Sequence, residues 1–502
     1  MFIYQIKDKS LLEVNTNQVS NVTIHGFSSQ MNIELANKIK LYENSFHIQH
    51  HEVIEKLLNG DIVSISPDNM IFLKIVGEFY HLEELIQMIR KYEDLIYDYF
   101  ADSPEIQYLI ELQDILSNLN DYNVNETSNK CIPLMEKISS ESFSSAILHV
   151  CLSNKTINYK TIFMLVRELN IVNDIILDKF LQISILKIEL MFDSYSSYQW
   201  DFQEELECFT RCLFEEHLLT IDNFSKRINF SPRMIDLVPG NLIRYISNKK
   251  KIDKSDFNFD LHTKMLNENK HSNEILEFIR NDDLENFQKI IVLSNEDLNQ
   301  LIPMSFYQRD TIFKNGHYNF IEYAAFYGAV KCFKFLLKNM APISHKKKDN
   351  LLGKCAIAGG NFEIIHLCQQ EKSSFLCCLE YAIKYHKNDV AEWLIDNNYD
   401  EILLKHSTDL CIRHYNIRVL LSIIKKGIVV SSGAYTAIES SNEILFSTYY
   451  NCFTLNHIEN SFLDFNHLHL AFYEGNLKVI DFIIRLTNYD INAIQGTVGY
   501  YI

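Results

Sequence analysis

The chain has 502 residues, 47% of them hydrophobic and 22% charged, which excludes a wholly disordered protein and suffices for about two or three cores. With only 14 glycines and 7 prolines, it lacks the turns that a sandwich or barrel needs, so a mainly α-helical fold is expected. The formal net charge of −18 argues against a nucleic-acid partner, because phosphate backbones bind clustered Lys and Arg side chains.

Residues 1–103 predict a small α+β domain. The segments Met1–Ile6 and Leu11–Val14 alternate in polarity as short strands do, and a helical pattern follows them. Further along, the sequence predicts a helix ending at the turn Asn59-Gly60, then a short strand over Ile62–Ile65. A new helix is expected to begin at Pro67-Asp68, since proline suits the first helical turn.

The run from Val53 to Leu85 resembles the second half of a BTB/POZ domain, in which a helix, a short β segment and two closing helices follow one another. The first half departs from that family, and Asn21–His25 is the one segment that resembles a remnant of it. An unrelated small α+β domain is the alternative. The resemblance implies that the N-terminal domain recruits other proteins or forms a homodimer.

Residues 104–268 predict helical hairpins, because apolar-periodic stretches alternate with Asn and Ser clusters. The clearest periodic stretches are Ile106–Leu119, Thr161–Leu169 and Ile171–Phe192. The polar stretch Asn118–Lys130 and the Lys, Asp and Asn-rich stretch Ser247–Asp260 are the candidate linkers.

Residues 269–502 contain an internal repeat, visible when Asn319–Ser344 is aligned with Asn466–Asn492. Each copy predicts a short helix, a glycine turn and a second helix. The turn glycines are Gly328, Gly360 and Gly475. Small residues are expected where two helices approach closely, and these are Ala324, Ala325, Ala356 and Ala471. Weaker copies have a polar residue where the second helix opens: Lys331, Glu363, Asp389, Arg418, Glu443 and Lys478.

This pattern resembles the ankyrin repeat, and Leu468-His469-Leu470-Ala471 is its closest match to the ankyrin signature. The resemblance implies a helical solenoid of about six to seven units. Ile275–Phe287 is expected to form a polar first unit, an insertion follows over Leu293–His317, and the repeat is expected to be truncated at the C-terminus.

The segments Ala356–His366 and Tyr381–Ile395 resemble, more specifically, divergent ankyrin-repeat proteins of parasitic protists that carry an ankyrin-associated domain of unknown function. This resemblance covers Asn273–Asn492 and implies protein binding without enzymatic activity.

Motifs for cofactors and catalysis are missing from the sequence, so neither a cofactor nor an enzymatic activity is expected. The nearest metal-site motif, His51–Glu55, has Glu where a helical zinc protease has its second His, and a polar helix start is the simpler interpretation. Eleven cysteines without a Cys-x-x-Cys pair are typical of reduced thiols, and we expect Cys332, Cys355 and Cys368 to be buried. With neither a signal peptide nor a membrane span, the expected location is cytoplasmic or nuclear, without a membrane partner.

In ankyrin proteins the two residues before the turn usually face the concave side and contact partners. The resemblance carries this role over to eight residues: Phe326, Tyr327, Lys384, Tyr385, Arg413, His414, Tyr473 and Glu474. The expected function is therefore a scaffold that binds a protein partner of unknown identity. One alternative, from the BTB-like segment, is a substrate adaptor for a cullin-type ubiquitin ligase. Another is an enzyme with its site in residues 104–268.

Overall fold

The structure is a computed structural model, mainly α-helical as predicted. It describes residues 3–4, 19–24, 27–32, 48–59, 61–66, 69–153, 159–192, 209–210, 212–213, 216, 218, 274–294, 297–302, 311–313, 318–339, 351–375, 377–397, 401–428, 432–454 and 465–487. Contacts group the chain into two compact units. The first unit comprises Met1–Ile110, Tyr399–Arg413 and Ile417–Ile502, and the second comprises Glu111–Asn398 and His414–Asn416. The linear division into 1–103, 104–268 and 269–502 stays a prediction.

The N-terminal part of the first unit is a small α+β arrangement. Its strands are β1 (Ile3–Tyr4), β2 (Val19–Ile24), β3 (Phe27–Asn32) and β4 (Val63–Ser64), and its helices are α2 (Ile48–Leu58), α3 (Met70–Phe79) and α4 (Glu83–Ala101). Strand β1 pairs antiparallel with β4, and β2 pairs with β3 in a hairpin. The predicted order of helix, short strand and helix is confirmed by α2, β4 and α3. The β2–β3 hairpin was not predicted, and Leu11–Val14 lies outside the described residues.

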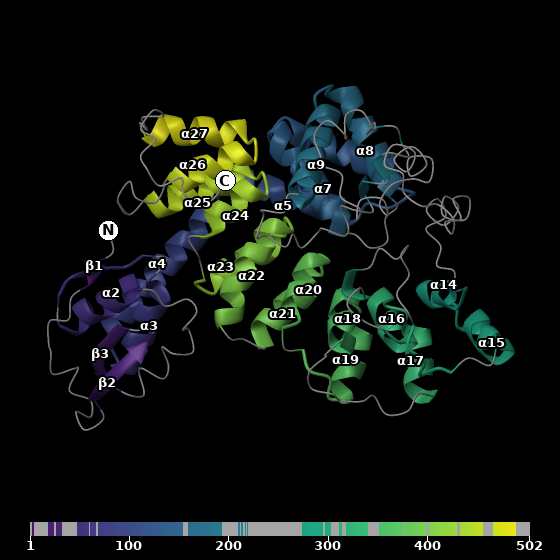
Figure 1. Ribbon diagram of the computed structural model, residues 1–502, viewed down its shortest axis with the longest axis horizontal. Helices are drawn as coiled ribbons and strands as arrows, with labels where there is room; N and C mark the ends of the chain where they lie inside the picture. The colour runs from purple at the N-terminus through teal and green to yellow at the C-terminus, as the bar shows by residue number, and fades with distance from the viewer. Residues whose placement is uncertain are drawn as a thin grey trace, which may run out of the picture. The chain divides into compact units, whose positions relative to one another are not determined.

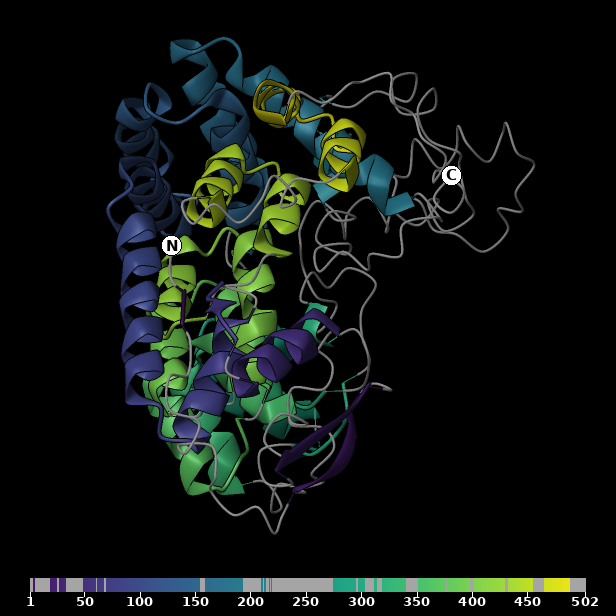
Figure 2. The ribbon, with the colours of Figure 1, turned by 90° about the vertical axis from the view of Figure 1, so that its left-hand side faces the viewer.

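Helix α4 connects this part to the C-terminal helices of the same unit. It buries Leu85, Ile89, Tyr92, Ile96 and Phe100, whose spacing of three or four residues places them on one face. That face packs against α3 and against α23 (Ile417–Lys425), beside which α4 runs in Figures 1 and 2. The ring of Phe100 also meets that of Tyr449 edge to face at 5.0 Å between centroids. Helix α4 therefore contacts both α3 and the C-terminal repeats of the first unit.

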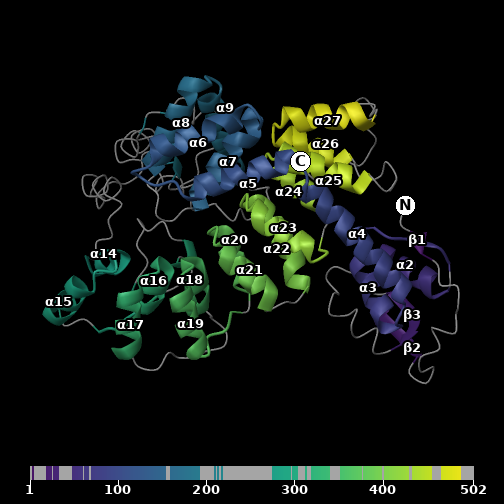
Figure 3. The same cartoon turned by 180° about the vertical axis from the view of Figure 1, so that it is seen from behind.

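Helical hairpins begin the second unit, as predicted. The helices are α5 (Pro104–Ser117), whose first seven residues belong to the first unit, α6 (Val124–Met135), α7 (Ser140–Ser153), α8 (Tyr159–Val172) and α9 (Ile176–Phe192). Helix α7 is buried from Ser142 to Ser153 and packs against α9, and Figures 1 and 3 show both helices beside α8. α7 is thus the central helix of this group.

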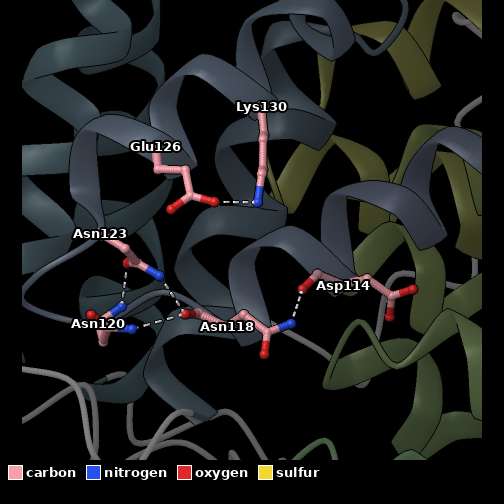
Figure 4. Close-up of polar contacts among 6 residues, drawn as sticks. All are labelled: Asp114, Asn118, Asn120, Asn123, Glu126 and Lys130. Carbon is pink, nitrogen blue, oxygen red and sulfur yellow. Dashed lines mark hydrogen bonds and ion pairs between the residues drawn. The ribbon is translucent and has the colours of Figure 1, made fainter.

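The candidate linker Asn118–Lys130 is a connection only in its first part: residues 118–123 join α5 to α6, whereas residues 124–130 belong to α6, so the predicted extent was wrong. The Asn118 carbonyl oxygen accepts hydrogen bonds from the side chains of Asn120 at 3.4 Å and Asn123 at 2.9 Å, and α6 begins directly afterwards (Figure 4). Asparagine side chains can satisfy the backbone of a tight turn, which explains why a polar stretch folds here. Buried Val124, Cys131 and Leu134 then fix α6. The second candidate linker, Ser247–Asp260, lies outside the described residues.

Seven helix pairs occur among the described residues after Asn273. Four pairs lie in the second unit: α14 (Glu274–Arg280) with α15 (Leu284–Ser294), α16 (Phe320–Tyr327) with α17 (Val330–Asn339), α18 (Leu351–Gly359) with α19 (Phe362–Gln370), and α20 (Leu379–Lys384) with α21 (Asn388–Asn397). Three lie in the first unit: α22 (Glu401–Arg413) with α23, α24 (Ser432–Glu439) with α25 (Glu443–Thr454), and α26 (Phe465–Tyr473) with α27 (Leu477–Thr487). The six predicted opening residues all lie in the first turn of a second helix, so the predicted register is confirmed.

A residue with positive φ ends the first helix of every one of these pairs. Three are the predicted glycines, and four are other residues: Asp282 at 52°, His386 at 51°, Tyr415 at 53° and Ser441 at 54°. Several of the turns are closed by a backbone hydrogen bond typical of a Schellman motif, such as Lys387 N–H to the Ala382 oxygen at 2.8 Å. Left-handed backbone costs a non-glycine residue roughly 1 kcal/mol, which these hydrogen bonds help to offset.

The small residues predicted at close helix approaches are confirmed as fully buried, namely Ala324, Ala325, Ala356 and Ala471. One close approach lies between α16 and α18. A Cβ atom added to Gly359 would lie only 2.2 Å from the carbonyl oxygen of Ala325. No helix that the structure describes is both long and apolar enough to cross a membrane.

Candidate partner-binding surface

The eight residues predicted to contact a partner lie where the first helix of a pair ends. Phe326 and Tyr327 are the last two residues of α16. In the other three pairs the first residue is the last of its helix and the second follows it: Lys384 and Tyr385 at α20, Arg413 and His414 at α22, and Tyr473 and Glu474 at α26. Side-chain positions are described for all of them except Tyr473, whose side chain lies outside the described residues.

Four of the eight side chains are buried within the chain. The exposed fractions are 0% for Phe326, 8% for Tyr385, 2% for His414 and 3% for Glu474. The rings of Phe326 and Tyr385 pack edge to face with centroids 5.3 Å apart, so these two residues join α16 to the end of α20. A partner reaches these four side chains only if the repeats open.

Tyr327 is half-buried and forms a cation–aromatic pair with Arg280 of α14. The guanidinium carbon of Arg280 lies 4.8 Å from the centre of the Tyr327 ring, and its Nη2 donates to the Tyr327 hydroxyl at 3.0 Å. The same nitrogen donates to the Tyr323 hydroxyl at 3.2 Å. Because 30% of the Arg280 side chain is exposed, the pair has both a fixed geometry and a solvent-facing edge.

A second pair of this kind joins the next two first helices. The Lys354 ammonium group of α18 lies 5.4 Å from the centre of the Tyr381 ring of α20, and both residues are half-buried. Burial raises the pKa of the Tyr381 hydroxyl above its usual value, so it stays protonated and can donate a hydrogen bond. Half-buried Lys384 follows one helical turn later. We call Arg280, Tyr327, Lys354, Tyr381 and Lys384 the first-helix face.

Sequence reasoning found Tyr327 and Lys384 of this face and missed the other three residues. Relative to the buried alanine of α16, α18 or α20, Lys354 lies two residues before, Tyr381 one before, Lys384 two after and Tyr327 three after, and these positions share one side of a helix. Tyr381 directly precedes Ala382, as Tyr323 precedes Ala324. Aligning the first helices on this alanine is the signal that could have identified them.

Arg413 belongs to a different, structural contact in the first unit. Its guanidinium group lies 3.6 Å from a carboxylate oxygen of Glu439 on α24. One turn earlier, Asp409 accepts hydrogen bonds from Ser432 and Thr436, each at 3.1 Å. Burial raises the pKa of Asp409, while these hydrogen bonds and Arg413 oppose the rise. The arrangement fastens α22 to α24.

Glu322 gives the second unit a pH-dependent helix cap. It forms a capping box with Asn319, its carboxylate accepting from the Asn319 N–H at 3.0 Å. Burial raises its pKa from 4.5 to about 7, although that hydrogen bond opposes the rise. Folding therefore favours the protonated carboxyl of Glu322. Its contribution to the stability of the folded state is complete below about pH 4.5 and is lost as the pH rises through about 7.

Replacing Glu322 by glutamine is therefore expected to stabilise the protein more at pH 8 than at pH 5, by roughly 1–2 kcal/mol, because the amide stays neutral. Urea unfolding of both proteins at the two pH values measures this difference. Glu363→Gln, an exposed substitution in the first turn of α19, is the control. An equal effect of Glu322→Gln at both pH values would contradict the assignment.

Most cysteines in the described part of the chain are buried. No group of three or more His, Cys, Asp or Glu residues is placed to hold a metal ion there. Cys332, Cys355 and Cys368 are buried, as predicted, and burial raises the pKa of the Cys332 thiol to about 12. A thiol with such a pKa is a poor nucleophile at neutral pH.

Comparison with known proteins links one part of the repeats to a family. A family model described as a domain of unknown function, DUF3447, matches residues 343–423. The matched segment contains α18 to α22 and most of α23, a shorter stretch than the predicted Asn273–Asn492. No curated protein matches the chain. The segment 343–423 is therefore similar to DUF3447, in agreement with the resemblance to an ankyrin-associated domain of unknown function.

Proposed function

We propose that this chain is a scaffold that binds a protein partner through the first-helix face of its second unit. The observation that supports the proposal is the repetition of half-exposed cation–aromatic pairs, Arg280 with Tyr327 and Lys354 with Tyr381. Tyrosine and arginine are enriched among the residues that contribute most to binding at protein interfaces. Both side chains combine a polar group with an apolar part that the fold has already ordered.

The alternative role of these pairs is to fasten neighbouring first helices to each other. Each pair does span two helices, α14 to α16 and α18 to α20, so some contribution to stability is expected. A binding role differs because it also requires the exposed edge of Tyr327 and the ammonium group of Lys384. Because Tyr327 belongs to one of the pairs, its substitution requires a measurement of stability beside that of binding, whereas Lys384 belongs to neither pair and tests binding more directly.

The double variant Tyr327→Ala with Lys384→Glu is expected to weaken partner binding by at least about tenfold, because it removes one aromatic contact and reverses one charge. Partners are first captured with the full-length protein from its native cell and identified by mass spectrometry, and their affinity is then measured with purified proteins. Phe362→Ala with Lys338→Glu is the matched control, since both residues are exposed on second helices. Unchanged affinity in the first variant, with its circular dichroism spectrum intact, would refute the proposed surface.

A second candidate function rests on the N-terminal elements of the first unit. The order of β2–β3 hairpin, α2, β4, α3 and α4 agrees with the resemblance to a BTB/POZ domain. We propose on this basis that the chain can also act as a substrate adaptor for a cullin-type ubiquitin ligase. The full-length protein mixed with a purified cullin should then co-elute with it in gel filtration, and separate elution would reject this candidate.

A further inference from the structure

Exposed apolar side chains gather on the α8–α9 hairpin. Met164 is 52% exposed, Ile171 79%, Val172 57% and Ile175 49%. They are four of the thirteen large hydrophobic side chains that are exposed among the described residues, yet they lie within one stretch of twelve residues. Single exposed apolar residues are ordinary, whereas a contiguous group marks an interaction site.

The backbone that carries this group is fixed by asparagine side chains. Asn170 Oδ1 accepts from the Leu177 N–H at 3.0 Å, and Asn173 Oδ1 accepts from the Ile175 N–H at 3.2 Å. Beneath the hairpin, the rings of Phe163 and Phe180 both contact the ring of Phe209, at 5.3 and 5.9 Å between centroids. The exposed side chains are thus held outward by an ordered turn, which lowers the entropic cost of binding.

Tyr122 adds an aromatic ring near the other end of α8. Its side chain is 99% exposed although the turn that carries it is ordered by the asparagines of Figure 4. The neighbouring Asp121 accepts a hydrogen bond from the Thr161 hydroxyl, which holds this turn against α8 one helical turn before Met164. We call Tyr122, Met164, Ile171, Val172 and Ile175 the α8 patch.

The charges at the margin of the α8 patch indicate which partner it suits. Glu168, Asp174 and Asp178 are exposed beside it. Of the nearby cations, Arg167 is paired with Glu216 at 3.2 Å and Lys179 with Glu141 at 2.8 Å, and Lys160 is exposed one turn before Met164. Together with the net charge of −18, this acidic margin disfavours a second copy of the chain and an anionic membrane surface. A partner with Lys and Arg at its edges is favoured instead.

The geometry of the patch points to a helix as the occupant. Met164 and Ile171 are seven residues apart, so they lie on one outward stripe of α8, while its other sides pack against α6, α7 and α9. We propose that the α8 patch binds an amphipathic helix of a partner protein, whose apolar stripe is flanked by Lys and Arg. This site is separate from the first-helix face and does not depend on it.

A labelled model peptide tests the proposal on the full-length protein. The probe is a fluorescein-labelled amphipathic helix of about 18 residues, with a leucine stripe flanked by lysines, and a second peptide has glutamates in place of the lysines. Fluorescence anisotropy is expected to show at least about tenfold tighter binding of the lysine peptide. Ile171→Asp with Val172→Asp should weaken that binding at least about tenfold, whereas Val292→Asp with Leu293→Asp, at exposed positions of α15, should leave it unchanged.

A charge-reversal variant keeps the test decisive if the apolar substitutions disturb folding. Asp174→Lys with Asp178→Lys, both at exposed positions, should exchange the preference, so that the glutamate peptide binds more tightly than the lysine peptide. The proposal would be overturned if the α15 control lost as much affinity for the lysine peptide as the Ile171→Asp with Val172→Asp variant. It would also be overturned if the unsubstituted protein did not bind the lysine peptide at concentrations on the order of 100 µM. A dimer of the full-length protein that Ile171→Asp dissociates would assign the patch to a second copy and overturn it as well.

Discussion

Replacing Asn416 by alanine is expected to lower the free energy of unfolding by about 2–4 kcal/mol, since two buried hydrogen bonds are lost together. Asn416 is fully buried in the turn after α22. Its Oδ1 accepts from the Gln113 side chain at 3.1 Å, and its Nδ2 donates to the Ile383 carbonyl oxygen at 3.1 Å. Gln113 is itself only 1% exposed, so water cannot replace the lost acceptor without opening the structure.

Asn361→Ala is the matched control for this prediction, because Asn361 precedes α19 as Asn416 precedes α23. Its Oδ1 accepts from the Glu363 and Ile364 N–H groups at 3.0 and 3.2 Å, which is an ordinary helix cap. Loss of such a cap costs about 1 kcal/mol. Urea unfolding followed by circular dichroism compares the two variants. If Asn416→Ala were no more destabilising than Asn361→Ala, the buried contacts of Asn416 would not contribute to stability.

The repeats could be predicted from sequence because their spacing is local. The six opening residues and the buried alanines follow from helical periodicity, and each lies where it was expected. The glycine pattern found only three of the seven turns. His386 and Tyr415 occupy the same left-handed position as Gly328, and their positive φ angles reveal an equivalence that the residue types do not.

The binding surface was harder to predict because burial depends on neighbours that are remote in the sequence. Tyr327 and Tyr385 are the same residue type at the same position before the turn. Tyr327 stays half-exposed over Arg280, whereas Tyr385 is 8% exposed and packs on Phe326. No pattern within one repeat distinguishes them.

Contacts between the hairpins and the repeat turns were also beyond sequence reasoning. The ring of His149 on α7 stacks on that of Tyr415, with centroids 5.3 Å apart, and Gln113 binds Asn416 although some three hundred positions separate them. Pairings between residues so far apart are set by tertiary packing, which neither propensity nor periodicity records. One predicted binding residue, His414, is buried in this same turn.

Gly359→Ala is expected to destabilise the second unit by about 2–3 kcal/mol, because the new methyl group would meet backbone rather than a movable side chain. Its Cβ would lie 2.2 Å from the Ala325 carbonyl oxygen and 3.2 Å from that of Phe326, so α16 and α18 would have to separate. Gly328→Ala is the control, because φ there is +69° and, apart from its chain neighbours, the atom nearest to the added Cβ is the Asn361 Cβ at 3.7 Å. Only the left-handed backbone penalty of about 1 kcal/mol therefore applies. Thermal unfolding should rank Gly359→Ala as clearly less stable than Gly328→Ala. The reverse order would mean that the two helices can move apart at little cost, and that the close approach does not hold the repeats together.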